Sequence, residues 1–342
     1  MAEVLGPRGS AQLISKASKH VFISTEGVET LSKDLLERIK NNKEYIHFKG
    51  WKSHALNPSV CDQSAIDWIF LVDALNFSFW SVPGKEKYTV RYGKSDYTGY
   101  WSLCAAVNRA LDQGIPITSA AYCKDFTIDQ ARQVFASDSA TDMPMLEDRV
   151  KVMNEVGQIL LEKFNGTFAN CISKSNNNAQ DLLKLVAEHF PCFRDEGEYE
   201  GQRVSFYKRA QILIADVWAC FEGQGLGKFT DIDTLTMFAD YRIPQTLVYF
   251  KMMSYSEELN ALLNKDHMFQ NGDIMEMDIR GVSIWAVELL VKRMNELIKE
   301  DNDLKGVHIN AVLLDHFLWD YRRKHDAKTR CIPFHKVRCI YY

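Results

Sequence analysis

The chain has 342 residues, of which 46% are hydrophobic and 25% are charged, and its formal net charge at pH 7 is −4. This balance is typical of a soluble globular protein. The small negative charge argues against direct binding of a nucleic-acid duplex, because such binding needs a basic surface. No stretch approaches the roughly 20 apolar residues that span a membrane, and the N-terminus lacks the apolar core of a secretory signal.

Eight cysteines are spread along the sequence, and none forms a C-x-x-C pair or a zinc-binding spacing. Several lie inside apolar stretches, which favours buried and reduced thiols. We therefore expect a cytoplasmic protein without a metal site or a membrane partner.

Helical periodicity dominates the rest of the sequence. Apolar residues spaced three and four apart line one face of a helix. This pattern predicts helices over Val28–Ile39, Tyr97–Leu111, Met145–Phe164, Asp181–Phe190, Val204–Phe221, Gln245–Met253, Glu257–Leu263, Ile279–Ile298 and Ile309–Lys324.

Strand signals are few and lie near residues 66–92. Aromatic and β-branched residues predict strands at Trp68–Asp73, Asn76–Val82 and Lys87–Arg91, and a Pro-Gly turn precedes the last of them. The polar stretch Arg194–Gln202 is expected to be a surface loop. We predict a mostly α protein with a small antiparallel β element near 66–92. It forms a single domain over 1–342, which can divide into lobes of about 1–140 and 141–342 with the site between them.

The most informative segment is 236–249, where Asp240 lies between an apolar stretch and a helix started by Pro244. Phe238 and two tyrosines surround it in the sequence. An aspartate at such a junction commonly caps the helix that follows. A carboxylate among rings also suits a site that holds a flat base and stabilises a nearby positive charge. Both interpretations stay open at this point.

Two further helices carry polar and aromatic side chains that suit ligand binding. Lys208 and Gln211 share one face of the helix predicted around 206–218, although their spacing alone favours a solvated helix face. The C-terminal helix places Asp315 and Trp319 on one stripe and Asp320 on the next, with Tyr321 beside them. These acids can form surface ion pairs, or they can bind adjacent hydroxyl groups of a sugar-like ligand.

His54 and Trp101 are the remaining candidates. His54 follows Trp51 in a lysine-containing segment, and Trp101 lies where a polar, aromatic loop enters a helix. A lone histidine is more often structural than catalytic, so spacing alone assigns neither residue a role. No Ser/His/Asp, HExxH or phosphate-loop pattern is present.

Together these segments resemble the queuosine salvage proteins, the queuosine 5′-phosphate N-glycosylases. The segments that carry the resemblance lie in order along the chain: Ala74–Trp80, Tyr97–Trp101, Tyr207–Gln211, Leu235–Gln245 and Asp315–Tyr321. Each is modest by itself, but their order and completeness make coincidence a poor explanation.

The resemblance implies a fold similar to helical DNA glycosylases and a hydrolase activity. Such proteins release the base queuine from queuosine 5′-monophosphate, so that queuine is salvaged for tRNA modification. They use a small nucleotide substrate and need no cofactor. The resemblance also implies roles for residues of this chain: Asp240 is catalytic, and the substrate-binding residues are Phe238, His54, Trp101, Lys208, Asp315, Trp319, Asp320 and Tyr321.

The implied chemistry fits these residue types. Breaking an N-glycosidic bond builds positive charge on the ribose ring, which a carboxylate such as Asp240 stabilises or attacks covalently. Phe238 and Trp101 would stack on the base, His54 would contact base or phosphate, and Lys208 would contact the phosphate. Either Asp315 or Asp320 would bind the cyclopentenediol of queuine. Two alternatives are a non-catalytic binder of a modified base or nucleotide, and a DNA or RNA repair glycosylase.

Overall fold

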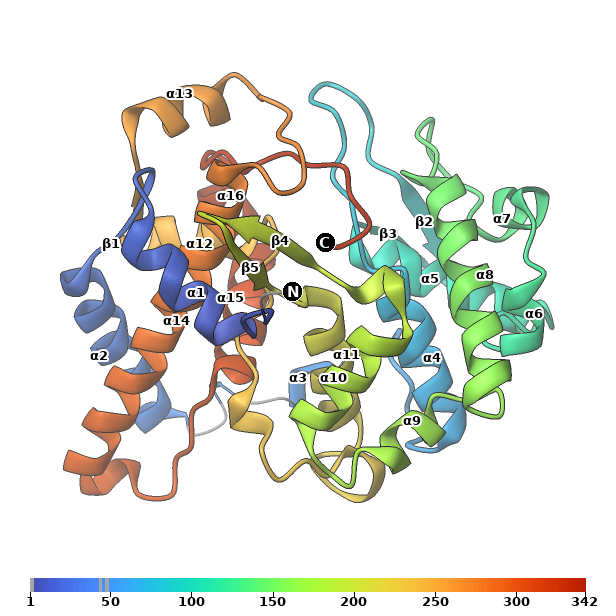
Figure 1. Ribbon diagram of the computed structural model, residues 1–342, viewed down its shortest axis with the longest axis horizontal. Helices are drawn as coiled ribbons and strands as arrows, with labels where there is room; N and C mark the ends of the chain where they lie inside the picture. The colour runs from blue at the N-terminus through green and yellow to red at the C-terminus, as the bar shows by residue number, and fades with distance from the viewer. Residues whose placement is uncertain (1–2, 43–44, 47–48) are drawn as a thin grey trace. The chain divides into compact units, whose positions relative to one another are not determined.

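The computed structural model describes residues 3–42, 45–46 and 49–342 (Figure 1). Its internal contacts divide the chain into two compact units, each built from three chain segments. Unit 1 comprises Met1–Phe48, Asp195–Lys208 and Asp233–Val337. Unit 2 comprises Lys49–Arg194, Arg209–Ile232 and Arg338–Tyr342.

Unit 1 contains α-helices and two small antiparallel strand pairs. Its helices are α1 (Pro7–Ala17), α2 (Thr25–Asn41), α12 (Ile243–Tyr249), α13 (Glu257–Asn264), α14 (Ile274–Glu300), α15 (Ala311–Lys324) and α16 (Asp326–Thr329), with 3-10 turns at η3 (Ile232–Thr234) and η4 (Asn302–Leu304). Strand β1 (Val21–Ile23) pairs with β6 (Met253–Tyr255), and β4 (Glu196–Tyr199) pairs with β5 (Gln202–Ser205).

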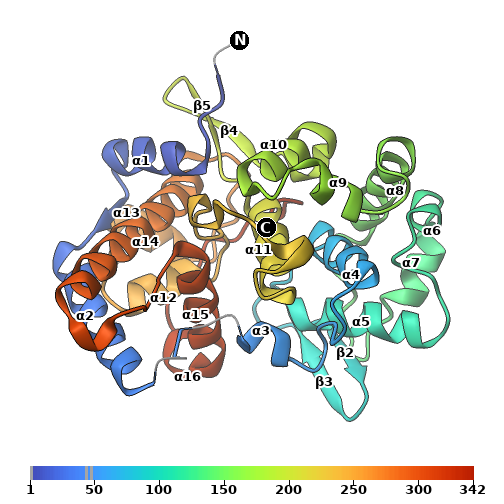
Figure 2. The same cartoon turned by 90° about the horizontal axis from the view of Figure 1, so that it is seen from below.

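The long helix α14 is the centre of unit 1. It packs against α1, α2, α12 and α15, and Figure 2 shows α1 and α2 beside it. The contact with α1 is close because Gly281 has no side chain. A Cβ atom at this position would lie 2.7 Å from Ile14. On α2, the predicted apolar stripe is confirmed, since Val28, Leu31 and Leu35 are all buried.

Unit 2 is also mainly helical. Its helices are α3 (Lys49–Ser53), α4 (Gln63–Ala74), α5 (Tyr100–Asp112), α6 (Ala120–Lys124), α7 (Ile128–Val134), α8 (Leu146–Lys163), α9 (Ala169–Lys174), α10 (Ala179–His189) and most of α11 (Lys208–Cys220), with 3-10 turns at η1 (Pro191–Phe193) and η2 (Gly225–Gly227). Strands β2 (Thr89–Tyr92) and β3 (Ser95–Thr98) form an antiparallel hairpin.

The predicted strand at 68–73 is wrong, because these residues belong to α4. Asp62 caps this helix by accepting hydrogen bonds from the backbone N–H groups of Ser64 and Ala65. Every residue from 68 to 74 is buried, so this part of the helix lacks the polar face that would reveal its period. Residues 76–82 are not a strand either, and Ser78 has a positive φ of 52° that interrupts an extended chain.

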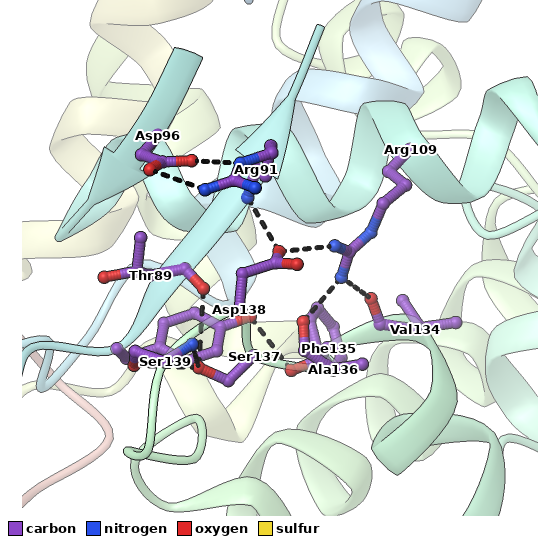
Figure 3. A network of polar contacts seen from close by, with 11 residues as sticks. Thr89, Arg91, Asp96, Arg109, Val134, Phe135, Ala136, Ser137, Asp138 and Ser139 are labelled. Atoms are coloured by element: carbon purple, nitrogen blue, oxygen red, sulfur yellow. Dashed lines mark hydrogen bonds and ion pairs between the residues drawn. The ribbon is translucent and has the colours of Figure 1, made fainter. Parts of the chain in front are cut away.

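The β element of unit 2 therefore lies at residues 89–98 and overlaps only the end of the expected region. Asp138 fastens this hairpin to the loop after α7 (Figure 3). Its Oδ2 accepts hydrogen bonds from the Arg91 backbone N–H at 2.8 Å and from Arg109 Nη1 at 3.0 Å. Arg91 in turn pairs with Asp96 on the opposite strand at 2.7 Å.

The mostly α fold with small β elements is confirmed. The other predicted helices are present, but several ends differ. The start of the helix predicted at 97–111 belongs to β3, α12 ends at Tyr249 rather than Met253, α14 begins at Ile274 rather than Ile279, and α11 starts later than expected. Residues 202–205 form β5 and Tyr207 has a positive φ of 47°, so the helix begins at Lys208. The expected loop at 194–202 is instead largely the β4–β5 hairpin. No described helix has the length and hydropathy to cross a membrane. The likeness to helical DNA glycosylases stays a prediction.

Candidate active site

Asp240 stands at the end of a buried segment that leads into α12. Residues 235–239 are buried, whereas Asp240 itself keeps partial exposure. Its Oδ1 accepts hydrogen bonds from the backbone N–H groups of Arg242 at 2.7 Å and Ile243 at 2.8 Å. Asp240 therefore binds two backbone N–H groups at the start of α12, although the N-cap position itself is Arg242. Within the described residues its Oδ2 accepts no hydrogen bond, so the capping role leaves the second oxygen available.

Asp315 on α15 holds the same segment from another direction. Its Oδ2 accepts a hydrogen bond of 2.8 Å from the backbone N–H of Phe238. The Asp315 side chain is buried, with 5% exposure. Burial raises the pKa of the Asp315 carboxyl well above its ordinary value, and the negative charge of Asp240 raises it further. The Phe238 amide and the positive charge of Lys208 oppose this shift without reversing it.

Arg280 of α14 binds the backbone of Ala239, the residue between Phe238 and Asp240. Its Nε donates to the carbonyl oxygen of Ala239 at 3.0 Å. Its other nitrogens form a two-pronged ion pair with Asp195, at 2.9 Å and 2.5 Å. A second acid, Glu276, lies 3.3 Å from the same guanidinium. These side chains are almost fully buried, and a buried ion pair holds its geometry only when such additional bonds complete it.

Lys208 belongs to this cluster through its backbone. Its N–H donates to Asp195 Oδ2 at 3.1 Å, so one carboxylate binds both Arg280 and the first residue of α11. The Lys208 side chain is 5% exposed, which is far less than a solvated helix face would give. Its positive charge acts on Asp315. The structure thus brings Lys208, Phe238, Asp240 and Asp315 together within unit 1.

The remaining candidates on α15 are more exposed than Asp315. Asp320 forms an ion pair of 3.4 Å with Lys324. The Arg323 guanidinium lies over the Trp319 ring at 4.9 Å. The Tyr321 ring stacks on His325 at 4.1 Å, and burial is the main cause that raises its pKa to about 12.

The candidates in unit 2 contact each other. The His54 and Trp101 rings stack at 3.4 Å with an angle of 7° between their planes. The Trp101 side chain is 9% exposed, and His54 covers one of its faces. His54 Nδ1 accepts a hydrogen bond from the Leu56 N–H at 3.3 Å, which fixes the orientation of the imidazole.

Sequence reasoning missed Arg280, Asp195 and His316. Asp195 lies in a polar stretch that resembles a surface loop, and Arg280 lies in a predicted helix. They are 85 positions apart, and nothing in the spacing indicates that they form a buried pair. His316 follows Asp315 and packs its ring edge-on against Phe238 at 6.2 Å. Burial lowers the His316 pKa to about 4, so this imidazole is neutral at pH 7.

One short segment carries a partly exposed carboxylate, Asp240, and an aromatic residue, Phe238, and a buried acid of α15, Asp315, binds it. This arrangement suits an enzyme that cleaves N-glycosidic bonds. Comparison with protein families matches residues 56–342 to the family described as queuosine salvage protein. The chain belongs to this family.

Several relatives in this family are similar over their whole length. A Mus musculus protein named queuosine 5′-phosphate N-glycosylase/hydrolase is 51% identical, and the match covers 100% of both chains. Proteins with the same name from Bos taurus and Schizosaccharomyces pombe are 49% and 40% identical. The bovine match covers 100% of both chains, and the yeast match covers 97% of this chain and 98% of the relative.

Proposed function

We propose that this protein hydrolyses the N-glycosidic bond of queuosine 5′-monophosphate and releases queuine for salvage into tRNA modification. The observation that carries the proposal is the environment of Asp240. One oxygen is fixed by two backbone N–H groups, and the other accepts no hydrogen bond within the described part of the chain. A rigid carboxylate with one available oxygen suits the stabilisation of positive charge that develops at C1′ of the ribose.

The reaction breaks the bond between C1′ and the base, and water supplies the new hydroxyl group on C1′. Asp240 would face C1′ and either stabilise the oxocarbenium-like ribose or form a transient ester with it. Because its Oδ1 is held by Arg242 and Ile243, Oδ2 is the atom we assign to this task. The reaction proposed here uses side chains and water alone.

We assign the other residues by the part of the substrate that their chemistry suits. Phe238 and Trp101 would stack on the base, and His54 would contact base or phosphate. Lys208 would bind the 5′-phosphate as a compact positive charge. Trp319, Asp320 and Tyr321 would receive the cyclopentenediol.

The compartment we propose is the cytoplasm, because all eight cysteines are free thiols and reduced thiols are usual there. In this proposal the protein binds a single modified nucleotide and no nucleic-acid duplex. Binding one nucleotide needs only one or two cationic side chains, which agrees with the net charge of −4.

The direct test incubates the purified protein with queuosine 5′-monophosphate and detects free queuine by chromatography. Asp240→Asn should abolish release while leaving the circular dichroism spectrum and substrate binding largely intact. Binding without release by the unaltered protein would indicate a non-catalytic binder. Full turnover by Asp240→Asn would remove Asp240 from the mechanism.

A further inference from the structure

Asp315 differs from the other buried acids of this site in its partners. Asp195 and Glu276 are 2% and 0% exposed, and both face the Arg280 guanidinium. Asp315 is 5% exposed, yet it forms no ion pair with any residue that the structure describes. A buried carboxyl group without a bonded cation is stabilised in its neutral form, since charge is costly away from water.

The two oxygens of Asp315 are used unequally. Oδ2 accepts the Phe238 N–H at 2.8 Å, which fixes the carboxyl group next to the proposed base-stacking residue. Oδ1 accepts no hydrogen bond from the described residues. In the neutral acid one oxygen carries a proton, and Oδ1 is the oxygen placed to donate it.

Asp240 and Asp315 therefore form a pair with contrasting surroundings: Asp240 ends the segment 235–240, and Asp315 of α15 binds the same segment at Phe238. Asp240 is partly exposed and accepts two backbone N–H groups, whereas Asp315 is buried and accepts one. Two acids whose environments differ in this way commonly divide the roles of carboxylate and proton donor in one reaction. Asp240 and Lys208 are the charged groups that act on Asp315.

The departing base needs such a donor. Queuine is a 7-deazapurine, so it lacks the N7 atom at which an ordinary purine is protonated before it leaves. The negative charge that the base gains when the bond to C1′ breaks must be neutralised by a proton at another basic atom of the ring. We propose, on the basis of the function proposed above, that Asp315 is the general acid that protonates queuine as the bond to C1′ breaks.

The bond between C1′ and the base breaks, and its electron pair goes to the base. The proton on Asp315 Oδ1 moves to the base, which leaves as a neutral molecule. Water then bonds to C1′, and the proton that it loses returns to Asp315 and restores the acid.

Three substrates distinguish general acid catalysis by Asp315 from a role of Asp315 in substrate binding alone. Queuosine 5′-monophosphate needs the proton. A 7-deazapurine nucleotide without the cyclopentenediol needs the proton but has no diol to bind. 4-Nitrophenyl riboside 5-phosphate needs no proton, because 4-nitrophenolate is a stable leaving group. The turnover number at saturating substrate is measured for the unaltered protein, Asp315→Asn and Asp240→Asn.

Asp315→Asn should lower turnover of both nucleotides by about 100-fold, which is the low end for general acid catalysis. It should leave turnover of the nitrophenyl substrate within a few-fold of the original. Asp240→Asn should abolish turnover of all three substrates. In Asp315→Asn the neutral amide mimics the neutral acid, so the Asp315→Asn protein should keep its fold.

Equal losses on the nucleotides and the nitrophenyl substrate would overturn the proposal. A loss confined to the nucleotide with the diol would also overturn it and make Asp315 a diol contact. The unaltered protein gives a second measurement that needs no variant. Its turnover of the nucleotides should fall at high pH, as Asp315 loses its proton, more than its turnover of the nitrophenyl substrate. Failure of the unaltered protein to release queuine would instead refute the proposed function.

Discussion

Arg280 donates a hydrogen bond of 3.0 Å from Nε to the carbonyl oxygen of Ala239, the residue before Asp240. The same guanidinium binds Asp195, which in turn accepts the N–H of Lys208. One buried cation thus fixes the backbone beside the proposed catalytic carboxylate and the start of the helix that carries Lys208. Small displacements of catalytic groups are costly to rate, so these contacts should matter for turnover as well as for stability.

The first prediction concerns this positioning role. Arg280→Lys keeps the charge but cannot reproduce the two-pronged pair and the bond to Ala239 together. We expect a loss of about 3 kcal/mol in the free energy of unfolding. We also expect turnover per folded molecule to fall by about 10-fold or more. Chemical denaturation and steady-state kinetics measure the two effects.

Glu276→Gln is the matched control for Arg280→Lys. Glu276 belongs to the same buried cluster, where it accepts hydrogen bonds from Arg280 and from the Gly272 backbone N–H. It should lose stability while keeping turnover per folded molecule. If both variants lose turnover in proportion to stability, the role of Arg280 is structural only.

A second prediction concerns Lys208 and the phosphate. Lys208→Ala should weaken binding of queuosine 5′-monophosphate far more than binding of the unphosphorylated nucleoside, because only the phosphate carries the charge that the ammonium attracts. A loss of about 10-fold or more in kcat/KM is expected for the nucleotide. Equal losses for nucleotide and nucleoside would argue against the phosphate contact.

A third prediction follows from the pKa of Asp315. Its pKa is raised in the folded protein, whereas the unfolded chain loses this proton near pH 4. The folded state therefore binds the extra proton, and the free energy of unfolding falls as pH rises from about 4 toward the folded pKa. Asp315→Asn removes this contribution to the pH dependence of the free energy of unfolding. The difference in stability between the unaltered protein and the variant should decrease between pH 4 and pH 8, as measured by thermal or urea unfolding. A difference that stays constant over this range would contradict the prediction.

A fourth prediction applies the same reasoning to His316 with the opposite sign. Burial lowers its pKa to about 4, below the value of 6.5 expected for an exposed histidine. The unfolded chain binds the proton first on acidification, so stability is lost as pH falls from 6.5 toward 4. His316→Gln should flatten this part of the stability curve. An unchanged slope in the variant would show that other groups cause the acid instability.

A fifth prediction tests the hairpin of Figure 3. Asp138→Ala removes acceptors for the Arg91 backbone N–H and for the Arg109 guanidinium. The side chain is partly exposed, so we expect a modest loss of about 1 kcal/mol. Hydrogen exchange at the amides of β2 should accelerate. Unchanged exchange at the Arg91 amide would mean that Asp138 does not hold the hairpin.

The sequence by itself determined much of this protein. Regular apolar spacing identified helices such as α2, because a helix with one buried face leaves a readable period. The same signal failed for α4, which is buried on nearly all sides and has no such contrast. Asp240 was found because its neighbours are aromatic and Pro244 marks the start of the next helix.

Only the tertiary structure decided which acids are buried and what they contact. Asp195 lies in a charged stretch that resembles a surface loop, yet folding pairs it with Arg280 inside unit 1. Asp315 and Asp320 look alike in the sequence, but one is buried against Phe238 and the other pairs with Lys324 near solvent. Local spacing fixes which residues share a helix face. Burial and partners depend on segments that are distant in the chain, and these set the ionisation of each carboxyl group.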